Sequence, residues 1–417
     1  MSWMWISQMA SRGMRPSATA GQEPRRGIRP RGTGRRSGDD AEDLVLRALP
    51  SSAREQAGEA WRAVEAAAPD VPPFARWDWT ELWLAHFGDV VPHEHLIAER
   101  DGVPCGAVLL TRSTVSRGPL TVRRLHLGTT GEPAGEGVFV EYNGLCAPSA
   151  ERTAVARALL AHAHRARGWD ELHLDGFDPI HAVPLLAVEP RFTVEQRWSP
   201  LLELDQASGD LIDVLRSKNV RKGVRRSLRG LLPYTTEWAH DREHAHAILD
   251  DLEQLHQQRW RARGEPGAFA SPRFRAFHRR LVDRWLPEGR AVVFAVRCEG
   301  ETVAALYGFV VDGILQLYQG GFRPFEDKKI SVGAAALLLL ARAAHERGMA
   351  GCEYLAGDYH YKTQLSTSKR PLVWARLVRR RPRALAIEAA RRAKNAVRPR
   401  RAGRTSDRAG RTSDDDE

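Results

Sequence analysis

The segment SVGAAALLLLARAAHERG, from Ser331 to Gly348, and the segment GDYHYK at residues 357–362 carry the clearest structural pattern in this chain. Ser331 is a suitable helix N-cap, residues 337–340 form a buried leucine turn, and Gly348 is a typical helix end. Apolar residues on both sides of the stretch are typical of strands. The pattern therefore predicts a crossover helix between two strands, which leads directly into a polar cluster.

The start of this helix is a candidate site for an anion. The free N–H groups of a first helical turn point at whatever precedes the helix and carry the positive end of its dipole. A glycine and three alanines follow the cap, so a ligand can approach the backbone closely. We expect a phosphate or pyrophosphate there, bound by Lys328, Lys329, Ser331, Val332, Gly333 and Ala334. An ordinary buried helix with a small-residue packing face is the alternative that spacing leaves open.

An internal repeat relates the two halves of the chain. Segment 158–178 aligns with 338–358 at an offset of 180 throughout, and the strand-turn-strand segment 97–110 matches 294–309 upstream. Two copies of one hairpin, helix and strand unit predict two adjoining mixed α/β domains. We expect the helices near 151–167 and 331–347 in equivalent places. Chance similarity between two helices rich in Ala, Leu and Arg is the alternative.

The order of elements in the second half resembles the CelD-like, FemAB-related branch of the GNAT acyltransferase superfamily. The resemblance rests on a strand at 314–321, a helix that bears Gly333, a strand that ends in Gly357-Asp358, and Tyr361-Lys362. The segments EYNGL at 141–145 and SKNVR at 217–221 resemble the same family, so that roughly 77–374 is covered. The family pattern has Gln or Arg three residues before the glycine, where this chain has Ile330.

This resemblance implies a fold class and a division of the chain. The fold is α/β, with tandem GNAT-like mixed-sheet domains and a helical insertion. The expected parts are a disordered basic segment at 1–40, a first GNAT-like domain at 41–198, a second at 199–375 with a helical insertion at 241–286, and a basic then acidic tail at 376–417. Within the first domain we expect a helix over 44–67, followed by a Trp-rich helix over 77–87.

The positive charge of the chain lies in its flanks. The net charge is +11, but residues 1–40 carry +5, residues 376–404 carry +11 and residues 405–417 carry −3, which leaves −2 for residues 41–375. A nearly neutral folded part disfavours an obligate nucleic-acid substrate. The basic tail, as a helix around Ile387, is a candidate for peripheral contact with an anionic membrane. The four cysteines have no close spacing, so we expect reduced thiols in a cytoplasmic protein, and no motif indicates a metal.

Two further segments are candidates for substrate binding. A helix over 210–231 would place its basic residues on one broad face, suited to an anionic acceptor, a CoA phosphate or RNA, unless that face is simply solvated. In the first half, the EYNGL segment follows a Gly-rich loop at 128–137, which we expect to be mobile over the cleft. The candidate substrate-binding residues are Glu141, Tyr142, Asn143, Lys218, Arg221, Lys222 and Arg225.

The polar cluster after the last strand of the second repeat is the candidate catalytic site. Acyl transfer from a thioester to an amine requires a base for the amine and an acid for the leaving thiolate. We expect Asp358 to orient or deprotonate the amine, Tyr361 to donate to the leaving group, and Lys362 to hold an acceptor carboxylate or phosphate. Asp358 as a helix N-cap paired with Lys362 is the alternative, and both roles are compatible.

The function that these features favour is acyl-CoA-dependent N-acyl transfer. The donor is acetyl-CoA or another acyl-CoA, and acetyl transfer is the favoured case. The acceptor is a small molecule or glycan precursor whose amino group belongs to an envelope or exopolysaccharide intermediate. A Fem-type transferase that uses aminoacyl-tRNA is one alternative. A non-catalytic adaptor whose basic tail binds nucleic acid or lipid is another.

Overall fold

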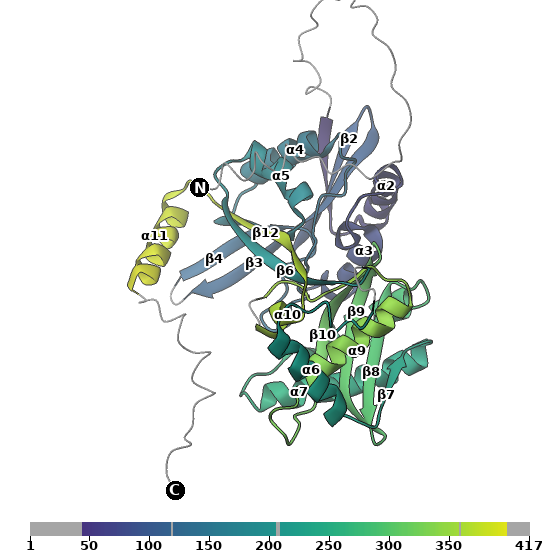
Figure 1. Cartoon of the computed structure of the whole chain (residues 1–417). Helices are drawn as coiled ribbons and strands as arrows, with labels where there is room; N and C mark the ends of the chain where they lie inside the picture. The colour runs from purple at the N-terminus through teal and green to yellow at the C-terminus, as the bar shows by residue number, and fades with distance from the viewer. Residues whose placement is uncertain (1–43, 118–119, 206–208, 358–359, 398–417) are drawn as a thin grey trace, which may run out of the picture.

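The computed structural model describes residues 44–117, 120–205, 209–357 and 360–397 (Figure 1). Its strands form one mixed sheet in the order β1-β2-β3-β4-β5-β12-β6-β11-β10-β9-β8-β7. The strands are β1 (Leu44–Pro50), β2 (His93–Arg100), β3 (Val103–Arg117), β4 (Leu120–Leu127), β5 (Glu171–Phe177), β6 (Thr193–Glu203), β7 (Tyr234–Trp238), β8 (Ala291–Cys298), β9 (Glu301–Val311), β10 (Ile314–Phe322), β11 (Gly351–Glu353) and β12 (Ser368–Val378). The helices are α2 (Arg54–Ala67), α3 (Trp77–Phe87), α4 (Arg152–Arg165), α5 (Pro179–Val188), α6 (Lys218–Gly230), α7 (Arg242–Arg261), α8 (Pro272–Trp285), α9 (Val332–Glu346), α10 (His360–Gln364) and α11 (Pro382–Val397), with 3-10 turns at Pro73–Ala75 and Ala268–Ala270.

The two halves of the chain repeat one unit, as the sequence predicted. In the first half, β2, β3 and β4 are antiparallel, and β5 returns parallel to β4 after α4. In the second half, β8, β9 and β10 are antiparallel, and β11 returns parallel to β10 after α9. The predicted tandem GNAT-like α/β fold is therefore confirmed, with α4 and α9 in corresponding positions of the two units.

The halves are joined because the last strand of the chain returns to the first half. β12 pairs antiparallel with β5 on one side and with β6 on the other, while β6 also pairs antiparallel with β11. The predicted boundary between 198 and 199 falls within β6. Any division of the chain into two sequence halves therefore separates strands that pair with each other in one continuous sheet.

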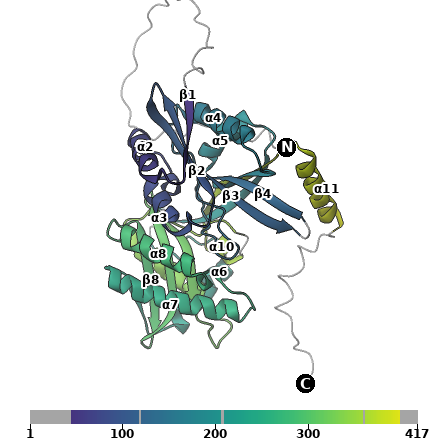
Figure 2. The same cartoon turned by 180° about the vertical axis from the view of Figure 1, so that it is seen from behind.

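Helices cover both faces of the sheet. In the first half, α4 and α5 pack on one face through Leu159 and Leu185, while α2 and α3 pack on the other. In the second half, α6 and α9 cover one face, and α7 and α8 cover the opposite one, as the two views show (Figures 1 and 2). Gly321 allows α7 to approach β10, since a Cβ there would lie 2.8 Å from the Cβ of Leu255.

The predicted helix over 44–67 is wrong in its first part. Residues 44–50 form β1, which pairs along its whole length with β2 and lies at the edge of the sheet. The helix α2 begins only at Arg54. Leu44 and Leu46 lie against the core of the first half, a two-residue spacing that suits a strand. Long-range pairing with β2 thus overrides the local helical pattern.

The predicted basic tail beginning at 376 starts within strand β12 and continues into α11, the helix expected around Ile387. Ala375 and Leu377 are buried in β12, and α11 buries Ala384 and Ile387. Arg376 of β12 forms an ion pair with Glu388 of α11 at 2.7 Å. Ile387 therefore packs against the protein, and contact of the basic segment with an anionic membrane stays a prediction. In the described part of the chain, no helix is long and apolar enough to span a membrane.

This packing predicts the effect of shortening the chain. A chain that ends at Trp374 loses the buried side chains of Ala375 and Leu377 and the end of the β12 ladder. We expect it to lose at least about 2 kcal/mol of unfolding free energy, since one fully buried large aliphatic side chain contributes roughly 1.5–3 kcal/mol. Chemical denaturation measures this loss. A chain that ends at Val397 is the control and should match the full-length protein; equal stability of the Trp374 truncation would contradict the role of β12.

Candidate active site

The two central strands of the second unit separate and open a gap in the sheet. β10 and β11 pair in parallel only from Ile314 with Gly351 to Gln316 with Glu353. Beyond this point, β10 continues to Phe322 with an irregularity between Leu317 and Gln319, whereas β11 ends. The gap lies at the carboxyl ends of two parallel strands, where open α/β sheets bind their ligands.

The first turn of α9 lies at the same end of these strands. The hydroxyl of Ser331 accepts a hydrogen bond from the N–H of Ala334 at 3.3 Å, so the predicted cap is present. Among the described residues, the N–H groups of Val332 and Gly333 make no hydrogen bond. A Cβ added at Gly333 would meet only the ring of Phe322, at an ordinary 3.7–3.8 Å. Packing within the protein therefore does not require glycine there, whereas a ligand on the first turn would.

The presence of Ile330 where the family pattern has Gln or Arg has a structural reason. Its side chain packs against Gly230 of α6, in space that any larger residue at 230 would need. The hydroxyl of Ser227, also on α6, accepts a hydrogen bond from the N–H of Ser331 at 3.0 Å. Ile330 thus docks α6 beside the first turn of α9. Lys328 and Lys329, just before it, are exposed.

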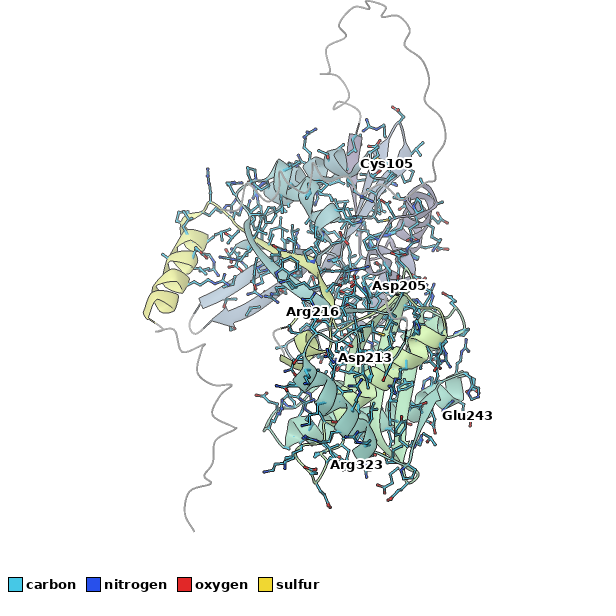
Figure 3. All side chains as sticks on the ribbon, viewed as in Figure 1. Cys105, Asp205, Asp213, Arg216, Glu243 and Arg323 are labelled. Carbon is cyan, nitrogen blue, oxygen red and sulfur yellow. The ribbon has the colours of Figure 1, made fainter. Side chains whose placement is uncertain are left out.

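The predicted basic helix is α6, which begins at a cap formed by Ser217. Lys218 and Lys222 are exposed. In contrast, Arg221 donates to the carbonyl of Leu215 at 2.6 Å, and Arg225 is paired at 2.5 Å with Asp213. Asp213 and Arg216 lie on the segment that precedes α6 (Figure 3). The two lysines are therefore the better placed of the four predicted residues to meet an anionic group.

The structure brings Glu141 of the first half to the polar cluster of the second. Its Oε2 accepts a hydrogen bond from the N–H of Ala356 at 2.7 Å. Burial raises the pKa of Glu141 to about 7, against the opposing effects of this bond and of the charge on Lys362. The Nζ of Lys362 lies 3.3 Å from the carbonyl oxygen of Leu355, and burial lowers the pKa of this amine. A carboxyl group that titrates near neutrality thus lies beside a half-buried amine.

A second contact between the halves holds this arrangement. Tyr142 has a positive φ of 60° and donates its hydroxyl hydrogen bond to Glu353 on β11. Glu353 is fully buried, and burial raises its pKa. Tyr142 is 8% exposed, so it fixes the loop that carries Glu141 more readily than it meets a substrate.

Asn143 supports the loop in the same way. Its side chain is fully buried, donates to the carbonyl of Leu127 at 2.9 Å and accepts from the N–H of Gly144 at 2.8 Å. These bonds use both ends of the amide. Of the predicted segment EYN, only Glu141 is therefore placed to meet a substrate.

The Gly-rich loop at 128–137 is anchored, which corrects the expectation of a mobile loop. The indole N–H of Trp79 donates to the hydroxyl of Thr129, and that of Trp83 donates to Glu132, both at 2.7 Å. Burial raises the pKa of Glu132 to about 7. Sequence reasoning missed both Glu132 and Glu353, because their burial arises only when loop and sheet are assembled.

Two of the predicted catalytic residues cannot be placed. Asp358 lies outside the described residues, and so does the side chain of Tyr361, whose backbone is part of α10. Their roles stay predictions. Over the described ranges, no group of three or more His, Cys, Asp or Glu side chains is arranged to hold a metal. The four cysteines are free thiols, and Cys105 lies far from the gap, in the first half (Figure 3).

Comparison with known proteins agrees with this geometry. Residues 216–363 match the family model of the acetyltransferase (GNAT) domain. This range includes α6, the separating strands, α9 and Lys362. This part of the chain is therefore similar to the GNAT acetyltransferase domain, in agreement with the GNAT resemblance seen in the sequence. No curated protein sequence matches the chain.

A solved structure shows the same fold over most of the chain. The crystal structure of FemX superposes with a TM-score of 0.51 at 12% identity, over 79% of this chain and 98% of that chain. Also similar are the C-terminal domain of a putative lysylphosphatidylglycerol synthetase from Agrobacterium fabrum (TM-score 0.46, 13% identity, 81% of this chain and 96% of that chain) and a tandem GNAT protein from the clavulanic acid biosynthesis pathway (TM-score 0.41, 15% identity, 81% and 98%). At such identities, the likeness to FemX shows the fold alone.

The half-buried carboxyl group of Glu132 predicts a pH dependence of stability. Its pKa in the folded protein, about 7, is above the usual 4.5, so the folded state binds the proton more tightly than the unfolded state does. Stability from this group is full below pH 4.5 and is lost as the pH rises to 7, by on the order of 3 kcal/mol. Glu132→Gln keeps an acceptor for Trp83 and removes the titration. We expect its unfolding free energy, relative to the parent, to rise between pH 4.5 and 7.

Chemical denaturation across this pH range measures the difference. Glu59→Gln is the control, since Glu59 is an exposed glutamate on α2. Parallel stability curves for Glu132→Gln and the parent would show that Glu132 titrates normally.

Proposed function

We propose that the protein is an acyl-CoA-dependent N-acyltransferase, with acetyl transfer as the favoured reaction. The main observation in support of this proposal is the position of Glu141 beside Lys362, at the gap where β10 and β11 separate. This gap belongs to the matched GNAT domain, and the first turn of α9 lies at its end. The acceptor that we propose is an amino group of an envelope or exopolysaccharide precursor, carried by a small molecule or glycan intermediate.

Glu141 is the base that we assign to the acceptor. An amine attacks a thioester only in its neutral form, so the ammonium group must lose a proton on binding. A carboxylate whose conjugate acid has a pKa of about 7 accepts that proton better than an ordinary glutamate near neutral pH. Ala356 orients this carboxylate through its N–H. Tyr361 remains the proposed donor to the leaving thiolate, and Lys362 the proposed contact for an acceptor anion.

The donor phosphates are proposed to lie on the first turn of α9. The N–H groups of Val332 and Gly333 point toward the space before the helix, and Lys328 and Lys329 supply positive charge. The exposed Lys218 and Lys222 of α6 supply more. The acyl group would then extend through the gap between β10 and β11 toward Glu141.

The donor site predicts a loss of CoA binding on substitution of Gly333. Gly333→Glu places a negative charge and a side chain on the proposed phosphate site, so we expect the dissociation constant for CoA to rise by at least about 10-fold, equivalent to 1.4 kcal/mol. Isothermal titration calorimetry with CoA measures it. Thr153→Glu is the matched control, because Thr153 is exposed at the corresponding turn of α4 and should leave the affinity unchanged. Equal affinities in the two variants would remove the donor site from α9.

The proposed base predicts a kinetic defect and a change in the pH profile. Glu141→Gln keeps the acceptor for Ala356 and cannot take a proton, so kcat should fall by about 100-fold or more. In the parent, kcat/KM should rise with pH to a plateau above about 7, because Glu141 must be deprotonated. Release of CoA thiol, with acetyl-CoA and a panel of amino sugars, measures both. Titration of the acceptor amine is common to both proteins, so identical profiles would exclude Glu141 as the base.

A Fem-type transfer from aminoacyl-tRNA is the second candidate function. The exposed Lys218 and Lys222 favour it, whereas the nearly neutral charge of residues 41–375 does not. Thermal shifts separate the two: stabilisation by CoA and acetyl-CoA supports the first, and stabilisation by tRNA alone supports the second. We further propose a cytoplasmic location, supported by the four free cysteines, and no obligate nucleic-acid partner. Peripheral membrane contact through the basic C-terminal segment stays a proposal.

A further inference from the structure

A line of three hydrogen-bonded side chains crosses the sheet of the first half. The hydroxyl of Ser113 on β3 lies 2.9 Å from Nε2 of His126 on β4. The other ring nitrogen of His126, Nδ1, lies 2.7 Å from Oδ2 of Asp175 on β5. The order of hydroxyl, imidazole and carboxylate is that of a Ser-His-Asp triad, a constellation that is recognised by geometry rather than by fold.

The register of the strands places these side chains on one face. Thr111 pairs with His126, and His126 pairs with His173, so Ser113 and Asp175 lie diagonally on either side of His126. The same face carries Ala107 and Leu109 further along β3, where α2 covers it. The three residues thus lie beyond the part of the sheet that α2 covers, beside the loop that leads to Glu141.

The burial of the three groups suits the roles of a triad. The side chain of His126 is only 8% exposed, whereas Ser113 is half-buried and so reaches the surface. Burial would raise the pKa of Asp175, but the hydrogen bond and charge of His126 and the charges of His173 and Arg124 lower it. An ionised Asp175 fixes the proton of His126 on Nδ1 and leaves Nε2 as the acceptor for the Ser113 hydroxyl.

The anchored loop passes directly over this line. Gly131 has a φ of 99°, and a Cβ there would lie 3.5 Å from the Cβ of Ser113 and 3.6 Å from Cδ2 of His126. Thr111 fixes the loop by donating its hydroxyl to the carbonyl of Thr130 at 2.7 Å. A peptide backbone is thereby held beside Ser113, where an oxyanion formed on an attacked carbonyl would need N–H donors.

We propose that Ser113, His126 and Asp175 form a nucleophilic site that hydrolyses carboxylic esters or thioesters, distinct from the acyl-transfer site at Glu141. The Ser113 oxygen attacks the acyl carbonyl while Nε2 of His126 takes the hydroxyl proton. The bond to the leaving alcohol or thiol breaks, and His126 returns the proton to it, which leaves an acyl ester on Ser113. Water then attacks this ester with His126 as base, and the carboxylic acid is released. The proposal does not rest on the proposed N-acyltransferase activity.

A serine-directed fluorophosphonate probe tests the proposal on the full-length protein. We expect the probe to label the parent at Ser113, identified by peptide mass spectrometry. Ser113→Ala should abolish labelling, and Ser116→Ala, an exposed serine of the same strand, should leave it unchanged. Asp175→Asn should slow labelling by about 100-fold or more, because the imidazole then loses its favoured tautomer.

Turnover of p-nitrophenyl acetate and of acetyl-CoA without an acceptor provides the second measurement. A rate that disappears in Ser113→Ala but persists in Glu141→Gln supports a separate hydrolytic site, and the ratio of the two substrates distinguishes ester from thioester. Labelling of the parent no faster than of Ser113→Ala, or labelling at another serine, would overturn the proposal. The three side chains would then only connect β3, β4 and β5.

Discussion

The backbone ladder of β12 holds the two halves of the protein together. β12 is the last strand of the second unit, yet it pairs with β5 of the first unit and with β6. β6, the last strand of the first unit in chain order, in turn pairs with β11 of the second unit. The two units have thus exchanged their final strands. Because β6 and β12 each have partners on both sides, neither half can complete its sheet without the other. One continuous sheet results.

The candidate site exists only because of this exchange. Glu141 and Ala356 are 215 positions apart in the chain, and Tyr142 and Glu353 are 211 apart, yet each pair is hydrogen bonded where β11 and β6 meet. Tyr142 adopts a positive φ, which costs of order 1–3 kcal/mol and persists only where neighbours hold it. The same packing removes water from Glu141, and that desolvation raises its pKa.

The sequence predicted what depends on local pattern and repetition. The crossover helix at Ser331, its cap, and the matching units around α4 and α9 all follow from spacing and composition, and all are present. It did not predict that residues 44–50 are a strand or that β12 returns to the first half, because both depend on pairing across the chain. Likewise, the sequence singled out the EYN segment. Only the folded structure shows that the side chain of Asn143 is hydrogen bonded to the backbone, whereas Glu141 is placed to meet a substrate.

The two faces of the central sheet divide the chemistry between them. α6 and α9 pack on one face and present the first helical turn, whereas on the other face α2 packs on β2 and β3 and α7 on β8, β9 and β10. The strands that lie between these helices carry polar side chains on that second face. These include His126 on β4, Arg197 on β6 and Glu353 on β11. The proposed donor at α9 would reach this face where the ladder is interrupted, and the pairing of β10 with β11 ends there. The gap in backbone pairing would therefore join the proposed phosphate site on one face to the carboxylate of Glu141 on the other.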